Sequence, residues 1–103
     1  MYTELESNSP IIRSLKKTIL KSGYRYVQIQ RNENVAVYAQ HEGDKIIAFE
    51  VFQIKLKKSG SRFLRQFYYE KFPSDEDIGR TGKSFANREK ALLFFIYLSS
   101  KLQ

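Results

Sequence analysis

The sequence contains no cysteine and a single histidine, His41. The lack of cysteine excludes disulfide scaffolds, thiol chemistry and cysteine-based zinc sites. One histidine alone assembles neither a nucleophile–base pair nor a transition-metal site. We therefore expect a protein that is not an enzyme, with no catalytic residues, no metal and no cofactor. We interpret His41 as a surface residue beside a turn.

The sequence also has no long apolar run. The longest, Ala91 to Leu98, has eight residues, whereas a membrane-spanning helix needs about 20. The first ten residues, MYTELESNSP, are polar and acidic, unlike a secretory signal. We expect no membrane partner and a cytoplasmic protein of the producing or host cell, with residues 1–9 as a flexible tail and residues 10–103 as a single α+β domain.

Acidic residues are scarce in one segment of the chain. The whole sequence has 18 Lys and Arg against 11 Asp and Glu, a net charge of +7. Residues 45–65 contain Glu50 as their one acidic residue and six basic ones: Lys45, Lys55, Lys57, Lys58, Arg62 and Arg65. Such a concentration of charge favours anionic partners. Lysines on an exposed strand also prevent aggregation at a sheet edge, so the segment alone leaves both interpretations open.

Hydrophobic periodicity predicts two helices and four strands. Ser9 and Pro10 would begin a helix over 10–22, which Gly23 would end, and Asn87 would cap a helix over 87–102. Strands are expected at 24–31, 35–40, 46–56 and 62–72, with turns at 32–34, Gly43-Asp44 and Ser59-Gly60. The predicted fold is a two-layer α+β domain, α-β-β-β-β-α, with an antiparallel four-stranded sheet and both helices on one face.

A turn at Ser59-Gly60 would determine which residues of the basic segment lie together. It would place Lys57 opposite Arg62, and Lys55 opposite Leu64. One exposed sheet face would then carry Lys55, Lys57 and Arg62, with Lys58 and Arg65 at its rim and Tyr68 nearby for base stacking. We predict a nucleic-acid interface that acts through phosphate contacts, and Arg80, Lys83 and Arg88 as its extension. Whether the partner is DNA or RNA stays open.

Two other motifs resemble ligand-binding sites but lack the residues or spacing that such sites require. Gly82-Lys83-Ser84 resembles part of a phosphate-binding loop, but the motif requires glycine at position 77, where the chain has Asp77, and a helix directly after the serine. We reject a nucleotide site there. The acidic cluster Asp75-Glu76-Asp77 lacks the spacing of a calcium loop. Loop solubility or interactions at a helix end explain it better.

The C-terminal helix supports an alternative function. It is apolar almost all the way round, so every side of it must be covered. The sheet can cover one side, and either the N-terminal helix or a second copy of the chain can cover another. The alternative to nucleic-acid binding is a structural or protein-interaction subunit, in which Leu93, Phe94 and Tyr97 form an oligomer interface with a protein partner.

Two resemblances add context. FPSDEDIG (72–79) followed by NREKAL (87–92) resembles small uncharacterised proteins of gut Bacteroidales and their phages or mobile elements. That resemblance implies an accessory protein of a phage or mobile element and no known activity. The layout, with Gly82-Lys83-Ser84, Arg88 and Lys90 near the last helix, is also similar to double-stranded RNA-binding domains. Those domains have an alanine-rich last helix, whereas this one has bulky Leu, Phe and Tyr.

Overall fold

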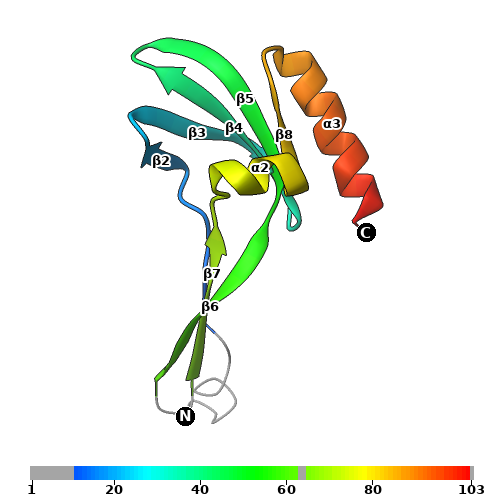
Figure 1. Ribbon diagram of the computed structural model, residues 1–103. Coiled ribbons are helices and arrows are strands. Elements are labelled where there is room, and N and C mark those ends of the chain that lie inside the picture. The colour runs from blue at the N-terminus through cyan, green and yellow to red at the C-terminus, as the bar shows by residue number, and fades with distance from the viewer. Residues whose placement is uncertain (1–10, 63–64, 103) are drawn as a thin grey trace, which may run out of the picture. The chain divides into compact units, whose positions relative to one another are not determined.

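Strands dominate the computed structural model, which describes residues 11–62 and 65–102 (Figure 1). In chain order the elements are β1 (Ile11–Arg13), β2 (Thr18–Lys21), β3 (Tyr24–Arg31), β4 (Val35–Glu42), β5 (Lys45–Gln53), β6 (Lys55–Arg62), β7 (Arg65–Lys71), α2 (Asp75–Thr81), β8 (Gly82–Phe85) and α3 (Arg88–Lys101). The expected flexible tail, residues 1–9, lies outside the described residues. None of the helices in the described ranges is long and apolar enough to cross a membrane.

The chain forms two compact units. The large-sheet unit comprises Lys16–Ile54 and Pro73–Gln103, and the small-sheet unit comprises the residues up to Leu15 together with Lys55–Phe72. The large sheet has the strand order β2-β3-β4-β5-β8, and the small sheet has the order β1-β7-β6.

Tight turns join the first strands of the large sheet. Ser22 and Gly23 both have positive φ, 54° and 85°, as a two-residue hairpin turn of type I′ requires. They place Lys21 opposite Tyr24. Gly43, with a φ of 62°, lies in the next tight turn, and Glu42 pairs with Lys45 there. The predicted Gly43-Asp44 hairpin and the predicted strand over 24–31 are confirmed.

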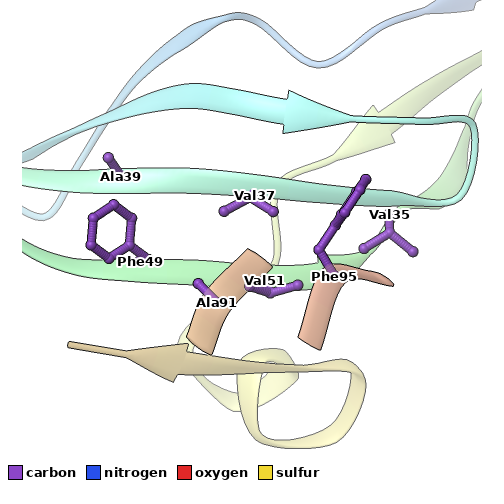
Figure 2. Close-up of a cluster of buried hydrophobic side chains, with 7 residues drawn as sticks. All are labelled: Val35, Val37, Ala39, Phe49, Val51, Ala91 and Phe95. Atoms are coloured by element: carbon purple, nitrogen blue, oxygen red, sulfur yellow. The ribbon is translucent and has the colours of Figure 1, made fainter. Parts of the chain in front are cut away.

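The hydrophobic core lies between the large sheet and α3, which contacts β4, β5 and β8. Alternate residues of β4 and β5 face the helix, and they meet Ala91 and Phe95 from its inner side (Figure 2). The cluster consists of Val35, Val37, Ala39, Phe49, Val51, Ala91 and Phe95. Asn87 caps α3 by accepting a hydrogen bond from the Lys90 backbone N–H at 3.1 Å, so the predicted cap is confirmed.

The other face of the large sheet is also buried at its centre. Tyr38 and Phe52 are fully buried there and stack with ring centroids 5.7 Å apart. The Tyr38 hydroxyl donates to the Lys16 carbonyl at 2.7 Å and accepts from Gln28 Nε2 at 3.0 Å. Because these partners satisfy a buried phenol, β4 is tied to β3 and to the segment before β2.

The short helix α2 begins with a capping box. Ser74 Oγ accepts from the Asp77 N–H, and the Asp77 carboxylate accepts from the Ser74 N–H, both at 3.3 Å. Asp77 of the acidic cluster therefore takes part in a helix-end interaction, one of the two roles expected for that cluster. The strand β8 then follows α2 and pairs with β5, with Gly82 opposite Phe52.

The small sheet is a hairpin with one extra strand. β6 and β7 are antiparallel, and their pairing ends with Arg62 opposite Arg65. β1 lies along the other edge of β7 in parallel, with Ile12 opposite Tyr68. A register shift between Lys58 and Gly60 marks a bulge in β6.

The predicted four-stranded two-helix fold is wrong. Residues 11–13 and 18–21 are strands, so the described part of the expected helix 10–22 is not helical. Ile11, Ile12, Thr18 and Ile19 are β-branched, which favours strands. The single sheet is replaced by sheets of five and three strands. The chain at Ser59-Gly60 continues β6 rather than turning, so the predicted register of the second hairpin is wrong as well.

Candidate nucleic-acid interface

One face of the small sheet gathers basic side chains. The hairpin register pairs Lys55 with Lys71 and Lys57 with Tyr69. Successive residues of a strand point to opposite faces, and paired residues point to the same face. These four side chains therefore share one face. Lys55, Lys57 and Tyr69 are exposed, and Lys71 is half-buried.

The third strand adds a cation on the same face. Arg13 of β1 pairs with Tyr69 of β7 and is exposed. Tyr69 thus lies in a row across the three strands, between Lys57 on one side and Arg13 on the other. Neighbouring strands are about 4.8 Å apart, so both cations flank the ring directly. We call Arg13, Lys55, Lys57, Tyr69 and Lys71 the basic face.

The acidic residue of the hairpin lies on the other face. Glu70 pairs with Leu56 and alternates with Tyr69. Its Oε1 atom accepts the backbone N–H of Leu15 at 2.9 Å, so this carboxylate holds the chain that follows β1. Among the side chains that the structure describes on the basic face, none is acidic. Four positively charged side chains therefore lie together on this face, and Glu70 lies on the opposite one.

The structure separates the residues that the sequence placed together. Lys55 and Lys57 share the basic face, as expected, but Lys58 and Tyr68 pair with each other on the opposite one. Arg62 and Arg65 pair at the far end of the same two strands. The register that puts Tyr68 beside the lysines depended on a turn at Ser59-Gly60.

Three residues of the basic face were missed from the sequence: Arg13, Tyr69 and Lys71. Arg13 was assigned to a helix that does not form. Tyr69 and Lys71 were missed because the observed register, in which Arg62 pairs with Arg65, places them opposite Lys57 and Lys55. The adjacent pair Tyr68-Tyr69 offers an aromatic to either face, so only the register decides which of them meets the lysines.

The residues expected to extend the interface lie in the large-sheet unit. Arg80 is exposed in the last turn of α2, and Arg88 is exposed in the first turn of α3. Lys83 of β8 has its Nζ 5.5 Å from the centroid of the Phe94 ring, a cation–π distance. Gly82-Lys83-Ser84 forms part of β8, not a loop before a helix, which agrees with the rejection of a nucleotide site.

Other polar residues fit structural roles. His41 is half-buried in β4, and its Nδ1 lies 3.5 Å from Arg25 Nη2. The buried Glu50 accepts a hydrogen bond from Ser84 Oγ at 2.6 Å. Within residues 11–62 and 65–102, no group of three or more His, Asp or Glu residues could hold a metal ion.

The outer side of α3 is a second surface of interest. Leu93, Ile96 and Tyr97 are 63%, 62% and 54% exposed, and their spacing places them on one stripe, which we call the outer stripe. Phe94 was expected in this surface but is half-buried, with its ring centroid 5.5 Å from that of Phe85. Ile96 takes its place.

Comparison of the chain with protein-family models, with curated proteins and with solved structures found no match. The interpretation of both surfaces therefore rests on their own geometry and chemistry.

Proposed function

We propose that this protein is a non-enzymatic binding module whose basic face holds the phosphates of a nucleic acid. The observation that carries the proposal is the convergence of Arg13, Lys55, Lys57 and Lys71 on one face of a sheet. Phosphate contacts from lysine and arginine supply most of the affinity in binding that does not depend on sequence. We therefore expect little sequence preference.

The affinity should depend steeply on salt, because each phosphate contact releases a condensed counterion. Four contacts predict a loss of about a hundredfold in affinity between about 50 and about 200 mM salt. Fluorescence anisotropy of labelled oligonucleotides, titrated with the protein at both salt concentrations, measures this loss. Binding that is absent at the lower concentration would refute the proposal.

Adjacent lysines of β6 provide a matched pair of variants. Lys57→Glu and Lys58→Glu change the net charge equally, one residue apart, but on opposite faces of the sheet. We expect Lys57→Glu to weaken binding about tenfold or more and Lys58→Glu to weaken it much less, since charges beyond contact are screened within about 10 Å. Equal losses would show that the net charge, and not the basic face, attracts the nucleic acid.

The outer stripe of α3 favours a second candidate function, assembly with another copy of the chain. Two α3 helices in antiparallel contact about residue 95 would place Leu93 opposite Tyr97 of the second copy. The same arrangement brings Glu89, in the first turn, opposite Lys101, in the last turn. Apolar contacts in the middle and opposite charges at the ends are the pattern of a helix pair.

Sedimentation velocity tests the second candidate. A dimer formed by the outer stripe should persist at high salt, because apolar burial does not depend on ionic screening, and Ile96→Glu should convert it to a monomer. Glu89→Lys should weaken it at low salt only. A monomer at all concentrations measured would contradict this candidate and leave the nucleic-acid proposal untouched.

A further inference from the structure

Tyr69 gives the basic face a feature that phosphate binding does not need. It is an aromatic ring, 36% exposed, in the middle of a row of cations. The ordinary role of an aromatic residue in a strand is to pack against its neighbours. Here its two cross-strand neighbours are Lys57 and Arg13, which a polyanion would contact at the same time as the ring.

We infer that the partner of the basic face is a single-stranded nucleic acid, with one base stacked on Tyr69. The inference rests on the proposed function and narrows its ligand. In a duplex the flat faces of the bases are stacked on one another and unavailable, whereas a single strand presents them. Aromatic side chains on a sheet, combined with a positively charged surface that follows the backbone, are the elements of single-strand recognition.

The spacing of the cations agrees with this arrangement. Lys57 and Arg13 flank the ring across the strands, and Lys55 and Lys71 form the next pair along the hairpin on the same face. Two residues along an antiparallel strand correspond to about 6.8 Å. A base on Tyr69 would therefore have Lys57 and Arg13 beside it, and Lys55 and Lys71 would lie about 6.8 Å further along the hairpin. Stacking requires only a π-face, so any base can occupy the position.

The opposite face of the same hairpin lacks this combination. Tyr68 lies there, but its direct partners are Lys58 and Ile12, and Glu70 is the next residue on that face. A carboxylate beside the ring repels phosphate. The sheet therefore offers one face, not two, to a strand.

The test compares a labelled 20-nucleotide oligo-dT strand, an RNA strand of equal length and a blunt duplex of 20 base pairs at about 50 mM salt. We expect the single strands to bind at least about tenfold more tightly than the duplex. Tyr69→Leu should weaken single-strand binding roughly 10- to 100-fold, since stacking on one base contributes to that extent. Tyr69→Phe keeps the ring and should bind like the unchanged protein.

The salt dependence separates lost stacking from a damaged fold. Tyr69→Leu should lower the affinity without changing the slope of log K against log salt, because no phosphate contact is removed, whereas Lys57→Glu should reduce the slope. Equal affinity for duplex and single strands, with Tyr69→Leu neutral, would overturn the single-strand inference and leave the proposed function standing. No binding to any of the three would refute the proposed function itself.

Discussion

Gly82 lies where any residue with a Cβ atom would collide with the paired strand. A Cβ atom built on it would lie 2.8 Å from the Cα and Cβ atoms of Phe52, and closer still to the Val51 carbonyl oxygen. Two of these contacts are backbone atoms of the paired strand β5, which cannot rotate away. We expect Gly82→Ala to lower the free energy of unfolding by about 1–3 kcal/mol, the usual cost of overpacking. Urea denaturation measures the change.

Gly23 provides the control, because glycine is favoured at this position by the backbone conformation and not by lack of space. No atom lies within 4 Å of a Cβ built there, but its φ is 85°. Asparagine tolerates positive φ better than alanine does. Gly23→Asn should therefore be milder than Gly23→Ala, while Gly82→Asn should be no better than Gly82→Ala. A rescue by asparagine at position 82 would show that conformation, and not space, selects glycine there.

At the residue scale the sequence identifies the charges of the candidate site but not their arrangement. Lys55 and Lys57 were predicted correctly as neighbours on one face, because they are two residues apart in any strand. The sequence favours Tyr68 over Tyr69 because a turn at Ser59-Gly60 would set the register of the hairpin. A shift of one residue moves every side chain to the other face, and local sequence does not determine where this hairpin turns.

At the element scale, the N-terminal segment shows the limit of apolar spacing. The spacing of Ile11, Leu15 and Ile19 fits a helix, yet these residues lie in or beside two short strands of different sheets. Gly23 suited both interpretations, since positive φ serves a helix end and a hairpin turn alike. β2 pairs with the adjacent β3, whereas β1 pairs with β7, more than 50 residues away, and no local sequence pattern indicates that second pairing. The strand 24–31 and the last helix were predictable from their periodicity, and the strand 35–40 from the turns on either side of it.

The orientation of α3 can be tested with two neighbouring residues. Phe95 is buried in the core with 8% of its surface exposed, whereas Ile96 is 62% exposed. We expect Phe95→Ala to lower the free energy of unfolding by about 3–5 kcal/mol, because it removes core contacts and leaves a cavity. Ile96→Ala should cost less than about 1 kcal/mol in the monomer.

Thermal and urea unfolding of both variants, followed by circular dichroism at low protein concentration, make the comparison. A large cost for Ile96→Ala that grows with protein concentration would point to a second copy covering the outer stripe. A large cost that does not depend on concentration would contradict the orientation of α3.

At the scale of the whole molecule, burial is distributed unequally between the two units. β4 has five consecutive buried residues, Val35 to Ala39, and is paired on both sides. Of the described side chains of β6 and β7, none is buried. Sheets with few buried apolar contacts open locally at low free-energy cost. The small sheet therefore has the lower local stability, as binding surfaces often do.

Amide hydrogen exchange should display this difference directly. We expect the amides of β4 and of the strands paired with it to exchange slowest, near the limit set by global unfolding, and those of β6 and β7 to exchange faster by orders of magnitude.

If the basic face holds a nucleic acid, adding an oligonucleotide should slow exchange in β6 and β7 and leave β4 unchanged, because a ligand stabilises the conformation that it binds. Equal protection of both sheets in the free protein would contradict the assignment of low stability to the small sheet. Protection by the oligonucleotide confined to α3 or β8 would move the interface to Arg88 and Lys83, and away from the basic face.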